Sequence, residues 1–562
     1  MFRFARARTL AYPLTGALSL SLLACASVSP GTGGAPAAGQ VALPVLQRLV
    51  MHAEPPTTER SDFRAGRTVD LIPFRPVYEY PLGIDAKTGK VIPQLATSWA
   101  LEPDGASVRF QLLKGVQFHQ GKGEFKAADV IYNWKLRRDF DPSVPSSNAP
   151  IYQNIETIDA VNDYEIIVRL KAPDGTFLTT NFTEGRGLFQ IFSSKHFEEI
   201  GTPTMLTGPV AGTGPYQFKE RVQGSFVRHE RVPYKHWRVT PDFPEFEFRY
   251  AKEASTRMAA LLTGEVQIAD LPEDLKVEAL KKGYKAIRSQ IAGNQVFVGF
   301  GCCHYKDPKN PAAGFVMPES PLVDVRVRRA LAKSIDRDEL NKSFFGGDAV
   351  PLYLLNFHPT RPGWNTDWER NFKSAYGYDP EAAKAELAQA GYNAGNPLVV
   401  HMQYPAETRG GFSGDDMADS IANHWRKIGV QVKPLNVDPS QVTGLRNQFR
   451  LENQVTLGNS ASDQWTGATT MGSTTSFGTR GRQPDNLNAD RALEGIATTM
   501  DEKRADQLWR EVGNEYYTTY RTSPLFTLAA EAVVDPKVVA DWVFPGTVTG
   551  YWSHVFDIKA VK

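Results

Sequence analysis

The chain has 562 residues, which is too long for a single hydrophobic core and predicts about three or four domain-sized units. A hydrophobic content of 41% and a charged content of 22% are those of a globular protein and exclude an intrinsically disordered chain. The 63 basic and 62 acidic side chains leave a formal net charge of +1, so the overall charge gives no indication of binding to nucleic acid or to an anionic membrane.

The first 25 residues have the pattern of a bacterial lipoprotein signal peptide. Three arginines precede an apolar run that is too short to span a bilayer comfortably, which takes about 20 residues. The run ends in Leu-Leu-Ala-Cys, which is similar to a lipobox and predicts cleavage before Cys25 and diacylation of its thiol. The alternative is plain secretion with an incidental cysteine, because Leu23 departs from the small or β-branched residue usual there. Residues 26–40 are rich in Gly, Pro, Ser and Ala and predict a flexible tether.

Strand and helix patterns mix along the rest of the chain. The stretch 108–134 predicts a strand, a turn with glycines and a helix that opens near Ala127. Strands at 216–220 and 226–230, joined by a short link with Gly224, predict a hairpin. Further strands are expected at 164–170, 245–250, 430–435 and 524–534, and further helices at 254–262, 379–391, 415–428 and 501–520. The mixture predicts an α/β class with antiparallel elements.

Only three cysteines are present, and two of them, Cys302 and Cys303, are neighbours. A disulfide prefers Cα atoms about 5.5 Å apart, against about 3.8 Å across a trans peptide, so neighbours are not expected to pair and no disulfide framework is predicted. His304 follows directly, and the Cys-Cys-His run raises the alternative of a metal site. Its spacing is unlike the usual structural zinc motifs, which favours a structural strand end.

Sequence motifs give no positive case for an enzyme. Gly411-Phe412-Ser413-Gly414 has the wrong spacing for a nucleophile elbow. His229-Glu230 is followed by Arg-Val-Pro instead of the second histidine of a zinc-protease motif. Gly212-Thr213-Gly214 precedes a proline, so it is neither a P-loop nor a dinucleotide-binding fingerprint. The absence of these motifs does not exclude an enzyme, because the geometry of a catalytic triad is not local in sequence, but it removes the positive case for one. We expect no catalytic residues, no cofactor and no metal.

Five segments in a fixed order resemble the family 5 extracytoplasmic solute-binding proteins of ABC importers, the class of dipeptide-, oligopeptide- and nickel-binding proteins. The segments are 91–99, 108–134, 212–218, 324–340 and 378–392. The resemblance implies a two-lobed, hinge-linked fold of the type II periplasmic-binding-protein kind. It places lobe I at 41–296 with an extra subdomain at about 91–211, lobe II at 297–526, and a return to lobe I at 527–562. The segments 295–300 and 524–529 would be the hinge crossings.

The same resemblance implies a set of ligand-binding residues. Arg409 matches the arginine that holds the ligand carboxylate in dipeptide binders, and Asp463 matches the aspartate that holds the ligand ammonium. Thr57 and Thr58 match a segment that contacts the ligand backbone. Arg409 is also explained as a solvated loop charge. Trp465 stands where the family usually has an Asp-Pro pair, and it either stacks on the ligand or simply packs.

The resemblance therefore implies a monomeric, lipid-anchored receptor outside the cytoplasm, in the periplasm or on the outer face of the membrane. It would capture a small peptide or a similar solute between two lobes and deliver it to an ABC permease and ATPase complex. Nickel chelates, opines and oligosaccharides remain alternative ligands. A secreted two-lobed hydrolase and a stand-alone sensor or chaperone remain alternative functions.

Overall fold

The computed structural model describes residues 46–53, 55, 68–139, 154–174, 177–178, 182–184, 189–201, 208–291, 293–404, 412–435, 448–449, 453–460, 483–499, 501–545 and 553–562. All of them belong to a compact unit that runs from Val45 to Lys562. The predicted signal peptide, tether and lipidation residue Cys25 lie outside the described residues.

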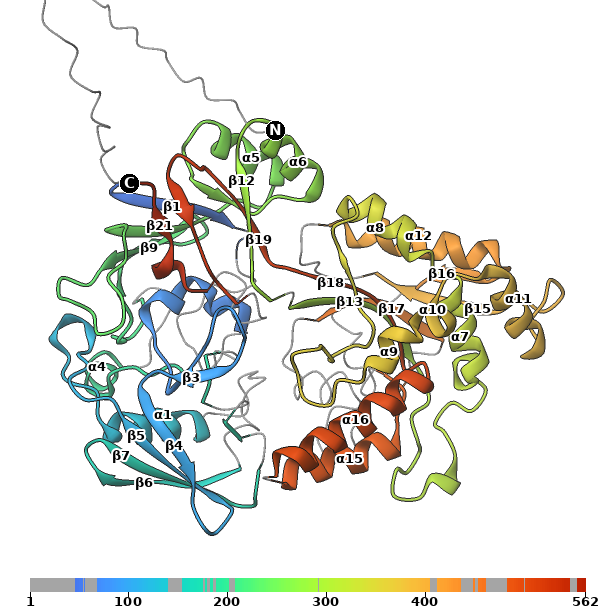
Figure 1. Ribbon diagram of the computed structural model, residues 1–562, viewed down its shortest axis with the longest axis horizontal. Helices are drawn as coiled ribbons and strands as arrows, with labels where there is room; N and C mark the ends of the chain where they lie inside the picture. Colours follow the sequence, from blue (N-terminus) through green and yellow to red (C-terminus); the bar gives the residue numbers. More distant parts are fainter. Residues whose placement is uncertain are drawn as a thin grey trace, which may run out of the picture. The chain divides into compact units, whose positions relative to one another are not determined.

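A seven-stranded sheet combines β1, the first strand of the described chain, with β19 from near the carboxyl terminus (Figure 1). Its strands, in spatial order, are β12 (Lys285–Arg288), β19 (Glu531–Val534), β11 (Ile268–Ala269), β1 (Arg48–Ala53), β10 (Glu245–Tyr250), β9 (Phe226–Arg231) and β8 (Tyr216–Val222). β1 is parallel to both of its neighbours, and the other pairs are antiparallel. β8 and β9 form the predicted hairpin, with Gly224 in its turn at a φ of 69°, a conformation that glycine adopts without strain. Helices α5 (Ala254–Leu262) and α6 (Glu273–Lys281) contact each other and this sheet.

A separate four-stranded antiparallel sheet has the order β4 (Ala96–Leu101), β5 (Ser107–Leu112), β7 (Glu165–Leu170) and β6 (Ile155–Asn162). The predicted strand, turn and helix at 108–134 are confirmed as β5, a turn with Gly121 and Gly123 at positive φ, and α1 (Ala127–Arg138). Phe110, Val168 and Trp134 belong to one buried cluster that joins α1 to the sheet. The other described elements between β1 and β8 are η1 (Thr68–Val77), β2 (Leu82–Ile84), β3 (Val91–Pro93), η2 (His119–Gly121) and α4 (Ser194–Ile200). Of these, η1 contacts β8 and β9 of the seven-stranded sheet.

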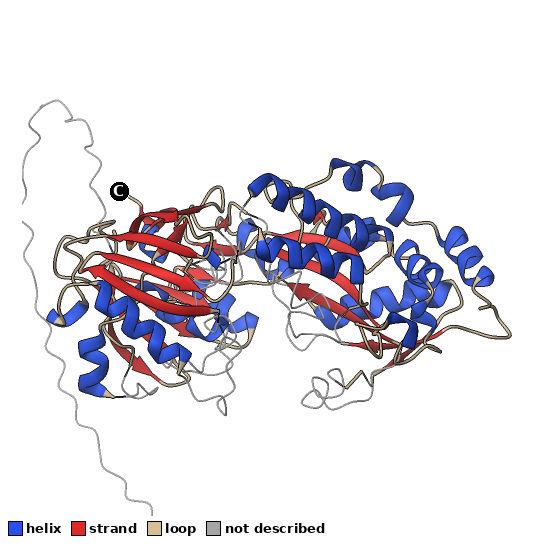
Figure 2. Ribbon diagram, turned by 90° about the horizontal axis from the view of Figure 1, so that it is seen from below, coloured by secondary structure: helices blue, strands red, loops and turns tan. Residues whose placement is uncertain are grey.

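A six-stranded mixed sheet has the order β14 (Val350–Pro351), β18 (Thr522–Leu528), β13 (Asn294–Gly301), β17 (Gln454–Ser460), β15 (Val399–Gln403) and β16 (Gln431–Pro434). Helices flank its strands (Figure 2). The helices of this region are α7 (Val325–Lys333), α8 (Arg337–Phe345), α9 (Thr366–Arg370), α10 (Phe372–Tyr376), α11 (Pro380–Gln389), α12 (Gly414–Lys427), α15 (Leu487–Thr498) and α16 (Glu502–Thr518). Among the described residues, the remaining elements are three short 3-10 turns, η3 (Pro311–Ala313), η4 (Pro321–Val323) and η6 (Val555–Asp557), and a strand pair, β20 (Val539–Asp541) with β21 (Lys559–Ala560).

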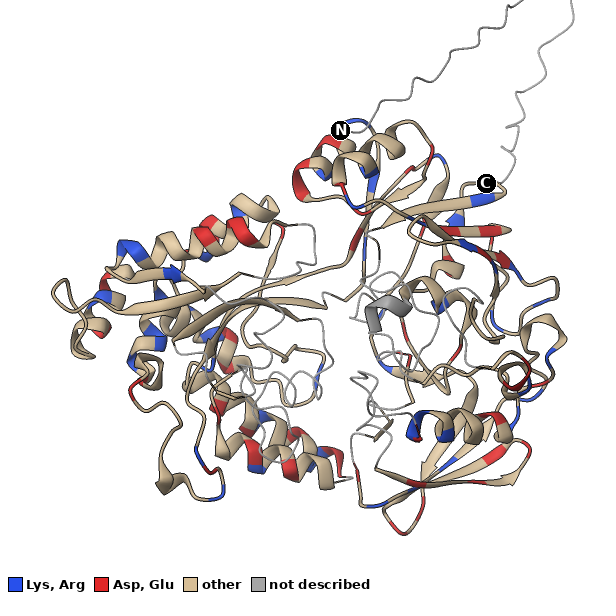
Figure 3. Ribbon diagram, turned by 180° about the vertical axis from the view of Figure 1, so that it is seen from behind, with Lys and Arg blue, Asp and Glu red and all other residues tan. Residues whose placement is uncertain are grey.

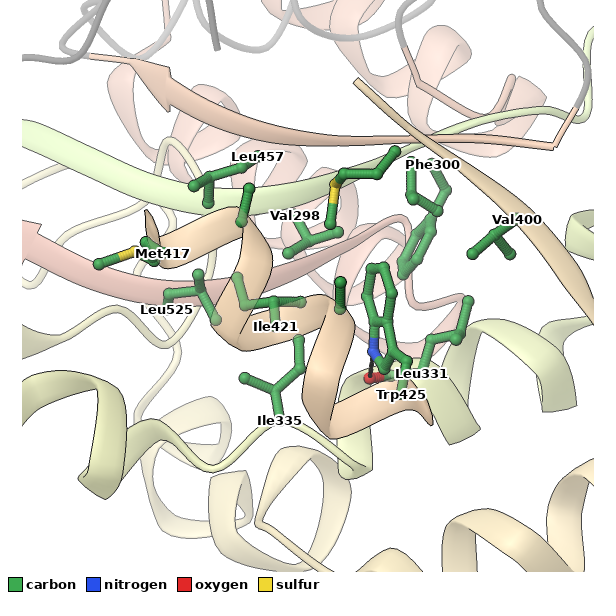
Figure 4. Packing of buried hydrophobic residues seen from close by; sticks show 14 of the residues in the cluster. Val298, Phe300, Leu331, Ile335, Val400, Met417, Ile421, Trp425, Leu457 and Leu525 are labelled. Carbon is green, nitrogen blue, oxygen red and sulfur yellow. Dashed lines mark hydrogen bonds between the residues drawn. The ribbon is translucent and has the colours of Figure 1, made fainter. Parts of the chain in front are cut away.

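Helix α12 confirms the amphipathic pattern predicted for 415–428. Ser413 caps its amino end by accepting a hydrogen bond from the Asp416 amide. The apolar positions Met417, Ile421 and Trp425 recur every four residues, so they lie on one face, and all three are fully buried. Figure 4 shows this face packed over Val298, Phe300 and Leu457 of the sheet, with the Trp425 indole donating to Leu331 O at 2.9 Å. This apolar face closes the largest of the buried clusters among the described residues.

Two chain passages join the seven-stranded and six-stranded sheets. One runs from β12 to β13, and the other runs from β18 to β19. The segments predicted as crossings, 295–300 and 524–529, fall in β13 and β18, which are adjacent strands of the six-stranded sheet. One connection to the other sheet lies directly before β13, and the other lies directly after β18. The lobe boundaries inferred from the sequence remain a prediction.

A buried ion pair ties the carboxyl-terminal segment to residues near β2. His554 Nε2 lies 2.5 Å from Glu184 Oε1, and the Gln94 side chain donates to Glu184 Oε2 at 2.6 Å. Burial by itself would raise the pKa of Glu184, but His554, with smaller contributions from Arg238 and Gln94, lowers that pKa from 4.5 to about 2. The charged carboxylate therefore stabilises the folded state.

Replacing Ile421 with alanine is expected to lower the free energy of unfolding by about 2–5 kcal/mol, because it leaves a cavity in a fully buried cluster. Urea denaturation followed by circular dichroism measures the change. Val277→Ala on the exposed face of α6 is the control, with an expected change within about 0.5 kcal/mol. Equal losses in the two variants would contradict the packing described here.

The Glu184 pair predicts a specific loss of stability in acid. Because the folded-state pKa lies below the unfolded value of 4.5, the stabilisation is complete above pH 4.5 and disappears as the pH falls towards 2. The contribution is on the order of 3 kcal/mol. Glu184→Gln should be less stable at neutral pH and should lose less stability than the wild type between these two pH values. If the denaturation midpoints of the wild type and of Glu184→Gln change with pH at the same slope, the Glu184–His554 contact does not contribute as described.

Candidate functional site

Several strands of the six-stranded sheet have their ends on the same side of the sheet. We call this side, where the parallel strands have their carboxyl ends, the edge of the sheet. β15 is parallel to both β16 and β17, so the carboxyl ends of all three point the same way. β17 is antiparallel to β13, with Ser460 opposite Gln295, and β18 ends beside the start of β13, with Leu528 opposite Asn294. In open α/β sheets, ligands bind outside the carboxyl ends of parallel strands. This edge is therefore the candidate functional site.

The predicted ligand-binding residues lie outside the described residues, but their places in the sequence follow from the strands. Arg409 is six residues beyond the end of β15, and Asp463 is three residues beyond the end of β17. Trp465 belongs to the same segment as Asp463, and Thr57 and Thr58 follow β1. The segments that carry Arg409 and Asp463 therefore begin at the same edge of the sheet, on neighbouring parallel strands.

The two faces of the sheet differ in polarity. Val400, Val455 and Leu457 lie on the face that α12 covers, in the buried cluster. On the opposite face, Gln454 Nε2 donates to Thr456 Oγ1 at 2.9 Å and also to Gln403 Oε1. The sequence analysis missed these two glutamine amides and the threonine hydroxyl. The alternation of polar and apolar residues in 454–457 is the signal that indicates Gln454 and Thr456. These uncharged groups can donate and accept hydrogen bonds beside the candidate site.

Three glycines open this polar face. A Cβ on Gly299 would lie 2.6 Å from the Gln483 side chain, and a Cβ on Gly458 would lie 2.6 Å from the ring of Phe297. A Cβ on Gly301 would lie 3.2 Å from the Gln454 side chain, a less severe contact. The glycines therefore let side chains from other segments lie directly on the sheet backbone.

The expectation that Cys302 and Cys303 are unpaired is wrong. Their sulfur atoms are bonded at 2.14 Å, across Cα atoms 3.8 Å apart. Cys303 has a φ of 67°, which turns the chain at the end of β13, and both sulfur atoms lie beside Leu322 O. Arg328 donates from Nη1 to Leu322 O at 2.6 Å. The sequence rule considered only the preferred Cα separation and did not anticipate this turn.

The neighbouring His304 contacts a carboxylate. Its Nδ1 lies 3.1 Å from Asp485 Oδ1, and the Tyr305 amide donates to Asp485 Oδ2 at 2.9 Å. The Asp485 amide in turn donates to Cys303 O. Within the described ranges, no group of three or more His, Cys, Asp or Glu residues is arranged to hold a metal ion. These contacts attach the chain just after residues 461–482 to the end of β13.

One buried carboxylate away from this edge has fixed partners. Glu79, which is fully buried, contacts Arg238 Nη2 at 3.0 Å and accepts from Trp237 Nε1 at 2.9 Å. Burial raises the pKa of Glu79, but Arg238 and His236 outweigh it and leave the pKa below its usual value. Removing either partner of such a buried pair would leave an uncompensated charge, so Glu79 and Arg238 are explained by their contacts with each other. Along the ribbon, Lys and Arg positions are interspersed with Asp and Glu positions (Figure 3).

No helix among the described residues has both the length and the apolar character that a membrane crossing requires.

Comparison with known proteins identifies relatives of this chain. Residues 90–481 match the model of the bacterial extracellular solute-binding proteins, family 5. A dipeptide-binding protein of Escherichia coli K12 is 27% identical over 386 residues, which is 66% of this chain and 68% of that protein. Among solved structures, the periplasmic binding protein DppA of Helicobacter pylori in complex with the peptide STSA is 22% identical, with a TM-score of 0.71 over 92% of this chain and 98% of that one.

A second solved structure that is similar to this chain contains a metal chelate instead of a peptide. NikA of Brucella suis in complex with Fe(III)-EDTA is 19% identical, with a TM-score of 0.73 over 92% of this chain and the whole of that one. Both structures are two-lobed periplasmic binding proteins, and their likeness confirms the predicted fold class.

Proposed function

The chain belongs to the bacterial extracellular solute-binding proteins of family 5, and from this premise we propose that it captures a small peptide or a similar zwitterion for an ABC importer. Family members bind peptides or related solutes outside the cytoplasm, work with an ABC permease and are not enzymes, in agreement with the sequence analysis. The ligand, its anchoring residues and the lipid anchor are the parts that we propose.

The proposal rests mainly on one observation: the segments that contain Arg409 and Asp463 both begin at the same edge of the six-stranded sheet. Arg409 and Asp463 follow β15 and β17, which are parallel neighbours, so their segments leave the sheet at one edge. A free peptide has an ammonium at one end and a carboxylate at the other. In this proposal Asp463 binds the ammonium, and Arg409 binds the carboxylate through its planar guanidinium. Thr57 and Thr58 contact the ligand backbone, and Trp465 stacks on a ligand side chain.

The same edge is where the chain passes towards the seven-stranded sheet. β13 starts there and β18 ends there, next to the passages from β12 and to β19. We propose that residues 41–296 and 527–562 form one lobe, with an extra subdomain at about 91–211, and that residues 297–526 form the other. A ligand that contacts both lobes would favour the closed arrangement by a population shift.

The anchor and the partners complete the proposal. Cys25 carries the acyl chains, residues 26–40 form the tether, and the monomeric body presents its closed form to the permease and ATPase complex. Two or three acyl chains suffice for stable membrane attachment where a single chain does not.

A metal chelate is the second candidate ligand. The structure of NikA with Fe(III)-EDTA has the same fold, and chelates of this type carry several carboxylates that Arg409 would bind. A thermal-shift screen of di- to pentapeptides, nickel chelates, opines and short oligosaccharides distinguishes the candidates. A response to nickel chelates alone would overturn the peptide assignment and keep the importer assignment.

A stand-alone sensor or chaperone is an alternative function. It would bind the same ligands, but the genome would lack a permease and an ATPase gene next to its own gene.

The true ligand is expected to raise the melting temperature, because it binds the folded state only. At a ligand concentration of 100 times Kd, the gain is about 2.7 kcal/mol, which corresponds to a shift of several degrees. Differential scanning fluorimetry measures it. If no peptide of two to five residues shifts the transition at millimolar concentration, the peptide assignment is wrong.

Asp463→Ala should weaken the binding of peptides with free amino termini by about a hundredfold or more. Loss of one partner from a buried charge pair typically costs about 3–5 kcal/mol. Isothermal titration calorimetry measures the affinity, and circular dichroism checks the fold. The control is Asp541→Ala on β20, an exposed aspartate in a strand pair outside the six-stranded sheet. Unchanged affinity in Asp463→Ala would remove this residue from the site.

A further inference from the structure

A small cavity lies against the polar side of the six-stranded sheet. Leucines 354 and 355 line it together with Asn356, Gln483, Tyr516, Arg521 and Thr522. The volume open to a water-sized sphere is about 10 Å³, which is room for about one water molecule. The lining residues come from the segment after β14, the segment that precedes α15, helix α16, and Arg521 with the first residue of β18, so the cavity joins four separate parts of the chain.

Four of these side chains each have one polar atom without a hydrogen-bond partner among the described residues. The atoms are Asn356 Oδ1, Gln483 Oε1, Tyr516 OH and Arg521 Nη2. The four side chains are only 3–4% exposed, so bulk water does not satisfy them. A buried polar atom left without a partner costs about 1–3 kcal/mol, and four in one cavity would be a large cost. Their common position indicates that they share one binding partner.

Each of the four groups is held by other contacts. The Asn356 amide donates to Gln295 Oε1 at 2.6 Å, with Asn356 in the left-handed region at a φ of 71°. Gln483 Nε2 lies directly over Gly299. Arg521 Nε donates to Pro484 O at 3.0 Å, and the guanidinium lies 3.9 Å from the centre of the Tyr516 ring. The four atoms are thus positioned in advance of any occupant.

The charge around the cavity selects a neutral occupant. The guanidinium of Arg521 repels a cation, whereas the two amide oxygens of Asn356 and Gln483 disfavour an anion. The carboxylate of Asp490 is also close. Burial raises the pKa of Tyr516 and Asp490 adds to that rise, although Arg521 opposes it, so the phenol stays protonated at neutral pH. A water molecule has two hydrogens to donate and two lone pairs to accept with, which matches two acceptors and two donors.

We propose that this cavity binds a single structural water molecule, which donates to Asn356 Oδ1 and Gln483 Oε1 and accepts from Arg521 Nη2 and Tyr516 OH. The water links the residues just after 461–482 to the start of β18 and to α16. Bridging waters of this kind are nearly as favourable in enthalpy as direct hydrogen bonds. The site is separate from the ligand-binding edge, because Thr522 lies at the opposite end of β18 from Leu528.

Tyr516→Phe tests the proposal against a matched control. Tyr376→Phe removes a hydroxyl that is equally buried and donates to Tyr517 O at 2.7 Å. If the Tyr516 hydroxyl binds the water, both variants lower the melting temperature by a similar amount, of a few degrees. If the hydroxyl has no partner, Tyr516→Phe leaves the melting temperature unchanged or raises it, because a buried unpaired hydroxyl has been removed. That second result would overturn the proposal.

A crystal structure at high resolution from crystals soaked in bromide tests the occupant directly. The expected result is density for one atom within hydrogen-bond distance of all four polar atoms, without an anomalous bromide signal. A bromide signal in the cavity would identify an anion site and contradict the assignment. A cavity without density at full resolution would contradict it equally.

Discussion

The pairing of β13 with β17 and β18 at the centre of the six-stranded sheet is the constraint on which the rest of the molecule depends. β18 is buried along its whole length, and β13 is buried except at its last residue. Central strands with both faces covered gain the apolar burial of two layers, and a shift of one residue would exchange the two faces. Val296, Val298 and Phe300 therefore fix the register, and the register fixes which polar groups lie opposite the helices.

Three consequences follow from that register. The parallel strands β15 and β17 end at one edge, where the segments with the proposed anchors begin. The passages to the seven-stranded sheet leave from the same edge, through the start of β13 and the end of β18. The face away from α12 carries glutamine, threonine and glycine, which leave room for other segments and hydrogen-bonding groups on the sheet. Binding and hinge movement would thus be coupled through strands that both functions share.

The elements with a strong local signal could be predicted from the sequence. Helix α12 has its apolar residues every four positions and a serine cap, and the β8–β9 hairpin has a glycine turn, so both were found with nearly the observed limits. The extent of the sheets could not be predicted, because strand order depends on contacts between distant residues such as Gln295 and Ser460. The Cys302–Cys303 bond was missed because the expectation used only the usual Cα separation of disulfides, and nothing in the local sequence signals the left-handed conformation of Cys303. The polar atoms around Arg521 come from four segments, so no local pattern marks them.

We propose that ligand binds at the carboxyl edge of β15 and β17, beside the two passages between the large sheets. Amide hydrogen exchange with and without a bound peptide, read by mass spectrometry, tests this location. We expect slower exchange on binding in residues 404–413 and 461–482 and in the connections 289–293 and 529–530, with little change in α11 or in the four-stranded sheet. Protection confined to the four-stranded sheet or to α11, with none after β15 and β17, would contradict it.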